Sequence, residues 1–440
     1  MRFKIQDDDA LYSLLKRYSD FLLHRAYRRI EYSGIERIPR NSAVIYAPNH
    51  TNALMDALVV LAIDEKPKVF VARADIFKNP KIARYLYFLR IMPIMRSRDG
   101  MEEVRKNDET IHKAADVLKD GVPFCILPEG THRTKHSLLP LGKGIFRIAL
   151  EAQELLREEM PLFIVPLGLE YGSYFRFRST ALVRVGKPIN VKDVIDSHPG
   201  LTKPELMNIM KSDLSEKMKE LILYIPDDRW YDPMLELTFI ETRKYMLRIP
   251  FKNGSVLVRR EMASKQVVSD VMKLREDHPE EAERLLMMAE EIRRRRKNSG
   301  IRVSSMMSRV PVLTAVWRGL VLLLTSFYTI PMGILTLPLV GLSSFLHKKM
   351  PDFAFINSIR FASQCLVWPL FLVIYGICLF FFLDWEWAMV GFILLVPAYH
   401  WCHDALRSLR LLVSDIKLTS DRELRRMLKD CRKMYSDLIN

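Results

Sequence analysis

The sequence of residues 43–56, AVIYAPNHTNALMD, predicts a strand that passes through a short turn into a helix. Its opening apolar run is typical of a buried strand. Pro48 ends this run, because proline has no N–H to donate to the next rung of a sheet. Residues 53–62 are almost wholly apolar and predict a helix. His50 therefore lies on the turn, and Asp56 lies about one turn into the helix.

His50 and Asp56 are the residue types of a general base and its supporting carboxylate. An imidazole at the end of a strand is exposed, and a nearby carboxylate can bind its other ring nitrogen and stabilise the imidazolium. A histidine close to an aspartate is, however, more often only a structural hydrogen bond. This stretch alone leaves both interpretations open.

The chain has 440 residues and a formal net charge of +15. This length predicts two or more structural regions. The basic balance favours partners such as nucleic acid, an anionic membrane or phosphorylated substrates. The five cysteines have no metal-site or redox spacing, which indicates thiols in a reducing compartment. The N-terminus has no apolar run long enough for a signal peptide, so we expect the first domain to be cytosolic.

Residues 9–31 carry apolar side chains at helical spacing, with arginines near the end of the run. Cations suit a helix C-terminus, so we expect one amphipathic helix within residues 1–34. Such a helix would either lie on a membrane surface or cap the following domain, and the pattern favours neither.

Short apolar runs then alternate with helical patterns. The predicted strands cover residues 68–72, 91–95, 122–127, 162–169 and 182–185, and the predicted helices cover residues 82–89, 104–119 and 144–157. This alternation predicts an α/β domain at residues 35–225, with a mostly parallel sheet flanked by helices. Ligands of such sheets bind beyond the carboxyl ends of the strands.

Two of the predicted strand ends carry polar groups. Leu127 leads into Glu129 and Gly130, and then into hydroxyl and basic side chains. Backbone N–H groups at a glycine can approach a phosphate, and arginine or lysine supplies positive charge. Arg96 follows another strand. Each feature alone fits a turn or a solvated arginine, but together with His50 they favour a site for an anionic substrate.

Four ordered segments resemble the motifs of the glycerophospholipid acyltransferase family, which includes glycerol-3-phosphate and 1-acylglycerol-3-phosphate acyltransferases. They are Asn49-His50 with Asp56, Ile91-x-Pro93-Ile94-x-Arg96, Leu127-Pro128-Glu129-Gly130-Thr131 with Leu139-Pro140-Leu141-x-Lys143-Gly144, and Ile164-Val165-Pro166-Leu167. The resemblance covers about residues 35–188. Four motifs in the right order are a far stronger signal than any one of them.

The resemblance implies that His50 is the general base on the acceptor hydroxyl and that Asp56 orients and charges it. The oxygen would attack the acyl thioester of acyl-CoA or acyl carrier protein directly, without an acyl-enzyme. No metal ion and no organic cofactor is implied. The residues implied to bind the substrate are Arg96, Glu129, Gly130, Thr131, Arg133, Lys143, Val165 and Pro166.

The chain departs from the family pattern twice. The common spacing has four residues between the histidine and the aspartate, and here there are five. A longer turn after His50 would absorb the extra residue, so we expect a ring nitrogen of His50 within hydrogen-bond reach of Asp56. The family's Glu-Gly-Thr is commonly followed by arginine, whereas here His132 precedes Arg133. This second departure leaves the phosphate contact open.

The chain changes character after residue 188. Residues 226–310 form a charged helical region, in which residues 264–297 end in the sequence RRRRK. Such a run is most often a solvated helix face, but before apolar segments it also fits a polybasic patch on anionic lipid. Nucleic-acid binding is not expected, because no groove-reading motif accompanies the charge.

Residues 311–405 predict a membrane region. The run 319–346 is uncharged but contains Pro331 and Pro338, and residues 361–383 are the clearest candidate for a transmembrane helix. A shorter apolar run at residues 388–399 has tryptophans at its edges, as at a membrane interface.

The basic residues that flank these runs predict their orientation. Positively charged loops favour the cytosolic side, so we expect a broken re-entrant hairpin at residues 319–346 and then a transmembrane hairpin. The tail at residues 406–440 is predicted to be an amphipathic cytosolic helix.

These observations favour an integral-membrane O-acyltransferase with a cytosolic catalytic domain, in the cytoplasmic membrane if the protein is bacterial. The acceptor would be glycerol 3-phosphate or 1-acylglycerol 3-phosphate, and the longer spacer favours the former. The alternatives are remodelling of another lysophospholipid, an inactive lipid-binding protein, and a thioesterase. An intact His50 argues against a mere binder, and the basic strand ends would have no purpose in a thioesterase.

Overall fold

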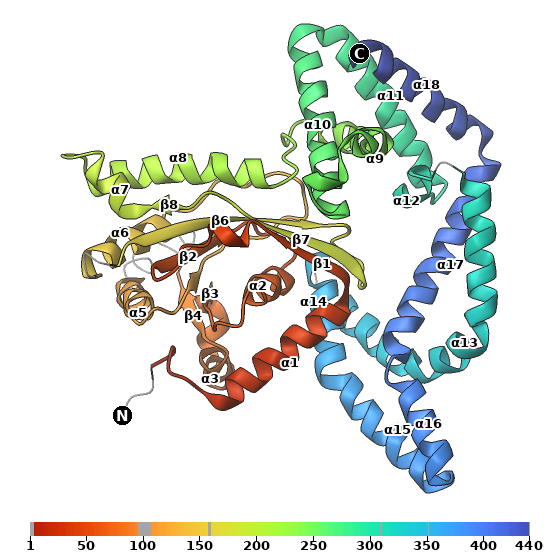
Figure 1. Ribbon diagram of the computed structural model, residues 1–440, viewed down its shortest axis with the longest axis horizontal. Helices are drawn as coiled ribbons and strands as arrows, with labels where there is room; N and C mark the ends of the chain where they lie inside the picture. The colour runs from red at the N-terminus through yellow and green to blue at the C-terminus, as the bar shows by residue number, and fades with distance from the viewer. Residues whose placement is uncertain (1–3, 96–106, 157–159, 309, 351, 440) are drawn as a thin grey trace. The chain divides into compact units, whose positions relative to one another are not determined.

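The computed structural model describes residues 4–95, 107–156, 160–308, 310–350 and 352–439 (Figure 1). The chain divides into two compact units. The first comprises Met1–Ile222 and His347–Cys365, and the second comprises Leu223–Leu346 and Leu366–Asn440. This division differs from the predicted one, because the first unit also takes in the N-terminal helix and a short segment from the predicted membrane region.

The first unit is built on an eight-stranded sheet with the order β1-β7-β6-β2-β5-β3-β4, in which β8 also pairs with β6. The strands are β1 (Tyr27–Ser33), β2 (Ala43–Pro48), β3 (Val69–Arg73), β4 (Ile91–Ile94), β5 (Phe124–Cys125), β6 (Leu162–Tyr171), β7 (Ser179–Val185) and β8 (Ile189–Asn190). Neighbouring strands are parallel except where β6 meets β7 and β8. The mostly parallel α/β sheet predicted from the sequence is confirmed.

Helices cover both faces of this sheet (Figure 1). They are α1 (Ala10–Ala26), α2 (Leu54–Leu61), α3 (Pro80–Phe88), α5 (Asn107–Lys119), α6 (Gly144–Leu155), α7 (Val191–Asp196), α8 (Lys203–Leu221) and α14 (Ile356–Ala362). α5, α6 and α8 share one apolar core with the sheet, around Phe124, Phe146 and Met210. α2 and α3 connect strands that step the opposite way along the sheet, so right-handed crossovers place them on the other face.

The N-terminal helix is shorter than predicted. α1 ends at Ala26, and the next residues form β1, which runs parallel to β7 at the edge of the sheet. The prediction of a helix up to residue 31 was wrong. Of the arginines that suggested a helix C-terminus, Arg25 lies in the last turn of α1, whereas Arg28 and Arg29 belong to β1, which is stabilised by main-chain hydrogen bonds to β7.

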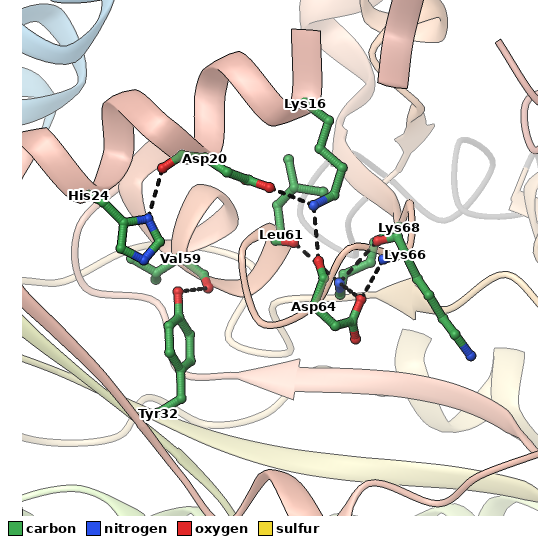
Figure 2. Close-up of polar contacts among 9 residues, drawn as sticks. All are labelled: Lys16, Asp20, His24, Tyr32, Val59, Leu61, Asp64, Lys66 and Lys68. Atoms are coloured by element: carbon green, nitrogen blue, oxygen red, sulfur yellow. Dashed lines mark hydrogen bonds and ion pairs between the residues drawn. The ribbon is translucent and has the colours of Figure 1, made fainter. Parts of the chain in front are cut away.

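α1 is anchored to the α/β unit by a network of lysines and aspartates (Figure 2). Nζ of Lys16 donates to Oδ2 of Asp20 at 2.7 Å and to the carbonyl oxygen of Asp64 at 2.9 Å. Nζ of Lys68, which is fully buried, donates to Oδ1 of Asp64 at 2.8 Å. Burial lowers the pKa of Lys68, and Asp64 opposes this effect. These contacts support the interpretation of α1 as a cap on the domain.

α14 is docked on the α/β unit. Nδ2 of Asn357 donates to the carbonyl oxygen of Tyr174 at 2.5 Å, and Nη1 of Arg360 donates to that of Phe175 at 2.9 Å. Asn357 is buried, whereas Leu366 is 66% exposed. Phe361 and Gln364, at the start of the run predicted to be transmembrane, are also buried. The start of this run therefore lies against the α/β unit, and the exposed apolar helix begins only after it.

The second unit is helical. Its helices are α9 (Tyr231–Arg248), α10 (Val256–Asp277), α11 (Pro279–Asn298), α12 (Val303–Met306), α13 (Pro311–Lys349), α15 (Trp368–Phe382), α16 (Trp385–Leu395), α17 (Ala398–Ser420) and α18 (Arg422–Ile439). α9, α10, α11 and α18 pack around one core that includes Leu237, Val271, Leu285 and Leu428. Part of the tail predicted to be an amphipathic helix at residues 406–440 thus belongs to this core.

Most side chains of the basic run at residues 293–297 form ion pairs. Arg293 pairs with Asp232, Arg294 with Glu291, and Arg295 with both Asp421 and Glu423. Arg296 is buried and makes two hydrogen bonds to Glu236, at 2.6 and 2.7 Å. The predicted solvated helix face describes Arg294, whereas Arg293, Arg295 and Arg296 tie α11 to neighbouring helices.

Two helices are long and apolar enough to cross a membrane by length and composition, namely Pro311–Lys349 and Ile356–Phe382. The first is α13, which continues through Pro331 and Pro338, so the predicted break there was wrong. Proline removes a hydrogen bond and kinks a helix without always ending it, and α13 is visibly bent (Figure 1). Its apolar side chains are exposed, as at Leu323 (71%) and Phe327 (82%).

Candidate active site

The candidate catalytic residues lie at the carboxyl edge of the sheet, as predicted. His50 follows β2, Glu129 follows β5, and Tyr171 ends β6. β5 and β6 are the two neighbours of β2 and run parallel to it. The carboxyl ends of parallel strands meet at one edge, so the sheet order brings these three segments together.

The buried carboxylate of Asp56 holds the imidazole of His50. Oδ2 of Asp56 accepts from Nδ1 of His50 at 2.8 Å and from the backbone N–H groups of Thr51 and Asn52, both at 2.7 Å. Oδ1 accepts from the hydroxyl of Tyr171 at 2.7 Å. Because Asp56 accepts from all these donors, it is the ionised partner and the proton of a neutral His50 ring sits on Nδ1. Nε2 of His50 then keeps a lone pair, as a general base requires.

The turn after His50 absorbs the extra residue of this motif. Ala53 has φ 47° and ψ −127°, close to the first central position of a type II′ turn. The N–H of Met55 donates to the carbonyl oxygen of Asn52 at 3.0 Å and closes this turn. The expected contact between His50 and Asp56 is confirmed, and the catalytic roles of the two residues stay predictions.

Glu129 joins the first motif to the third. Its Oε1 accepts from the backbone N–H of His50 at 2.7 Å, and its Oε2 accepts from that of Leu139 at 2.8 Å. Burial raises the pKa of Glu129 to about 7, against the opposing effect of these hydrogen bonds. Both carboxylate oxygens accept hydrogen bonds from backbone N–H groups, so Glu129 holds the loops of His50 and Leu139 together.

Gly130, Thr131 and Lys143 lie exposed near this junction. Gly130 has φ +63°, a conformation that L-residues with a side chain rarely adopt. Its N–H donates to the carbonyl oxygen of Leu127 at 3.1 Å, and Lys143 stands at the start of α6. Substrate binding by these three residues stays a prediction.

The predicted arginines have different outcomes. Arg96 lies outside the described residues. The N–H of Arg133 donates to the carbonyl oxygen of His50 at 3.0 Å, and its Nη2 donates to Oγ of Ser137 at 2.7 Å. The guanidinium therefore supports its own loop. His132, which precedes it, packs its ring against that of His50, with centroids 5.3 Å apart.

Val165 and Pro166 do not line an open surface. Both lie within β6, beside Tyr46 and Ala47 of β2, and both are buried. Substrate binding by these two residues stays a prediction. The fourth motif supports the exit of β2, where Asn49 exchanges hydrogen bonds with the backbone of Leu169 at 2.6 and 3.2 Å.

Two site residues were missed at the sequence level. Tyr171 bonds Asp56 although 115 positions separate them, and Nε2 of His132 bonds Asp352 at 2.6 Å across 220 positions. Neither tyrosine nor aspartate at such distances leaves a local signal. Among the described residues, no group of three or more histidine, cysteine, aspartate or glutamate side chains is placed to hold a metal ion.

Residues 29–170 match a family model described as Acyltransferase. The 1-acyl-sn-glycerol-3-phosphate acyltransferase of Cocos nucifera is 29% identical over 154 residues, which are 34% of this chain and 45% of that protein. The 1-acyl-sn-glycerol-3-phosphate acyltransferase alpha of Mus musculus is 27% identical over 135 residues, 30% of this chain and 46% of that protein.

A shorter match joins this chain to the glycerol-3-phosphate O-acyltransferase 2 of Saccharomyces cerevisiae, with 36% identity over 85 residues, 19% of this chain and 11% of that protein. The chain thus spans less than half the length of these relatives. The crystal structure of the 1-acyl-sn-glycerophosphate acyltransferase of Thermotoga maritima is similar at 20% identity and a TM-score of 0.35, over 50% of this chain and 83% of that one.

Proposed function

We propose that this chain, which belongs to the glycerophospholipid acyltransferase family through residues 29–170, transfers a fatty acyl group from a thioester to a glycerol phosphate. The acceptor is a hydroxyl of glycerol 3-phosphate or of 1-acylglycerol 3-phosphate, and the donor is acyl-CoA or acyl carrier protein. The observation that carries the proposal is the contact between Nδ1 of His50 and Asp56, which leaves Nε2 as a base at the open edge of the sheet.

The reaction follows from this arrangement. Nε2 of His50 takes the proton of the acceptor hydroxyl while the oxygen attacks the thioester carbonyl carbon. Asp56 stabilises the imidazolium that forms, because it is a buried carboxylate in direct contact with the ring. The tetrahedral intermediate then expels the thiolate, and the thiolate receives the proton from Nε2. The ester and the thiol are the products, and no acyl-enzyme forms.

Hydrogen bonds fix the backbone of His50 and one nitrogen of its ring. Asp56 is tied to Thr51, Asn52 and Tyr171, and Glu129 holds the N–H of His50 itself. A base fixed in this way loses little freedom when the acceptor binds. General base catalysis of this kind contributes about 10²- to 10⁴-fold to a rate.

The glycerol phosphate would bind beside this base. Exposed Thr131 offers a hydroxyl, Lys143 offers a positive charge, and Gly130 adopts the positive φ of the turn that precedes Thr131. Arg96 follows β4 in the sequence and is proposed as a further partner of the phosphate. The exposed apolar surface of α13 and α15 suits a protein that works on lipid acceptors at a membrane.

The test is an acyl-transfer assay on the full-length protein in detergent. Glycerol 3-phosphate, 1-acylglycerol 3-phosphate and other lysophospholipids are each offered with acyl-CoA and with acyl carrier protein donors. We expect transfer to a glycerol phosphate and a loss of at least about 100-fold in His50→Ala. The control is His24→Ala, on an exposed face of α1, which should keep the wild-type rate.

Each alternative function has its own outcome in this assay. Full activity in His50→Ala would end the general-base assignment. Transfer only to other lysophospholipids would indicate a remodelling enzyme, and release of free fatty acid without an acceptor would indicate a thioesterase. Binding of lipid with no transfer to any acceptor would favour an inactive lipid-binding protein.

A further inference from the structure

A second histidine stands beside the proposed base. The rings of His132 and His50 meet edge to face, with centroids 5.3 Å apart and an interplanar angle of 69°. On its other side, the ring of His132 meets that of Phe355 at 5.5 Å and 88°. His132 is therefore held between the active site and a segment that lies far along the chain.

That segment also supplies a carboxylate to His132. Oδ2 of Asp352 lies 2.6 Å from Nε2 of His132. Its Oδ1 accepts from the backbone N–H of Ala354 at 2.9 Å, and this bond, followed by the contact with His132, lowers the pKa of Asp352. An ionised carboxylate only accepts hydrogen bonds, so Nε2 of His132 carries the proton and the ring has one orientation.

Asp352 is placed by contacts that do not involve His132. The residues that follow it bond to the α/β unit at several points: Asn357 to Tyr174, Arg360 to Phe175, Gln364 to Leu22, and Cys365 to Tyr18. The segment at residues 352–365 is therefore held against the α/β unit beside the active site, independently of the contact between Asp352 and His132.

The ring of His50 can tilt, and the segment that carries Asp352 can restrict this tilt through His132. Asp56 bonds only Nδ1, and a ring held at one nitrogen can still tilt about that bond. The edge contact with His132 opposes this tilt, and the direction of the lone pair on Nε2 depends on the plane of the ring. A small misplacement of a catalytic group costs up to about 100-fold in rate.

We propose that Asp352 is a positioning residue of the active site, which acts through His132 to fix the plane of His50. The proposal rests on the proposed acyltransferase function. In sequence, Asp352 lies between the two helices that are apolar enough to cross a membrane. The part of the chain that joins these helices thus contributes Asp352 to the catalytic centre. It does so through His132, which is the residue inserted before Arg133.

The alternative is that the pair is only an ion pair near the surface. Asp352 has an exposed side chain (48%), and pairs of this kind contribute little to stability. A purely structural pair would change the melting temperature slightly and leave kcat untouched. A positioning pair changes kcat at an unchanged KM, so the kinetic constants separate the two explanations.

The test compares Asp352→Asn, His132→Gln and the double variant in the acyl-transfer assay, with the full-length protein in detergent. We expect each single variant to lose about tenfold in kcat, with the KM for the acceptor within about twofold of wild type. The double variant should be no slower than the slower single variant. Asp352→Glu, which keeps the carboxylate, should recover part of the rate and guards against a folding defect.

The matched control is Asp120→Asn. Asp120 is also an exposed carboxylate with partners from a distant part of the chain, Lys4 and Gln6, but it precedes β5 at the opposite edge of the sheet. This variant should keep the wild-type kcat. A wild-type kcat in Asp352→Asn overturns the proposal, and so do losses in the double variant that multiply those of the single variants.

A second measurement does not depend on activity. Diethyl pyrocarbonate modifies accessible imidazoles, and mass spectrometry reports the rate at His132. We expect this rate to rise several-fold in Asp352→Asn and to stay unchanged in Asp120→Asn. An equal rate in wild type and Asp352→Asn overturns the pairing. If wild type transfers no acyl group but His132 is protected by Asp352, the proposed function has failed and the pairing stands.

Discussion

At the scale of single residues, Ala53 carries the irregular spacing of the first motif. Five residues separate His50 from Asp56, and the turn that accommodates them places Ala53 at a positive φ of 47°. For a residue with a side chain, such a conformation costs about 1–3 kcal/mol of conformational free energy. Asp56 nevertheless reaches the ring of His50, so the turn stores strain in order to keep the contact.

Replacement of Ala53 by glycine should therefore stabilise the protein. Glycine adopts this conformation without strain but adds freedom to the unfolded chain, so we expect a net gain of about 1 kcal/mol in the free energy of unfolding. Thermal unfolding in detergent measures it as a rise of a few degrees in the melting temperature.

Ala57→Gly is the control for this prediction. Ala57 lies within α2, where glycine is less favourable than alanine by about 1 kcal/mol. The two substitutions should shift the melting temperature in opposite directions. A loss of stability in both would show that the backbone at Ala53 is not strained.

At the scale of elements, α11 illustrates how neighbouring arginines differ. Arg296 forms a buried, two-bond pair with Glu236 of α9, and its side chain is 10% exposed. Arg294 pairs with Glu291 on the same helix, and its side chain is 66% exposed. Removing one partner of a buried pair leaves an uncompensated charge, whereas removing an exposed partner leaves a solvated one.

The same substitution at these two positions should have very different effects. We expect Arg296→Gln to destabilise the protein by about 3–5 kcal/mol, because Glu236 stays buried without its partner. Arg294→Gln should leave the free energy of unfolding almost unchanged, because Glu291 stays solvated without its partner. Thermal unfolding of both variants in one detergent compares them directly, and equal shifts would contradict the assigned burial.

At the scale of the whole molecule, the chain connections limit how the apolar helices meet a membrane. Residues 222–230, which join α8 to α9, contain Asp227, Asp228 and Arg229. Charges of this kind are expensive in a bilayer core, so we expect this link to stay outside the membrane and the ends of α8 and α9 that it joins to lie on one side of it. α13 begins in the second unit and leads into the segment of Asp352 in the first.

Both ends of α13 are therefore expected on the same side of the membrane. Its 39 residues measure about 58 Å, which is too short for two passes through a core of about 30 Å. We therefore expect α13 to contact the membrane without crossing it. In sealed vesicles, an impermeant maleimide should label Lys348→Cys and Lys252→Cys from the same side, in a background with Cys378→Ser. Labelling of the two positions from opposite sides would show that α13 crosses the membrane.

The sequence by itself determined the mostly parallel α/β sheet, the edge of the sheet that carries the site, and the contact of His50 with Asp56. These features follow from short patterns: apolar runs set the strands, and the residue after a strand lies at its carboxyl end. The four ordered motifs also indicated the family, because each motif is a short local pattern that can be recognised in the sequence.

The tertiary structure alone decided the rest. Residues 27–33 became a strand because β7 was available to pair with them, and Val165 and Pro166 were buried because β6 lies beside β2. Tyr171 and Asp352 joined the site across long separations in sequence, which only the order of strands and the docking of α14 bring together. Local periodicity specifies which element a segment forms, but the partner of a buried polar group depends on the packing of elements that are distant in the chain.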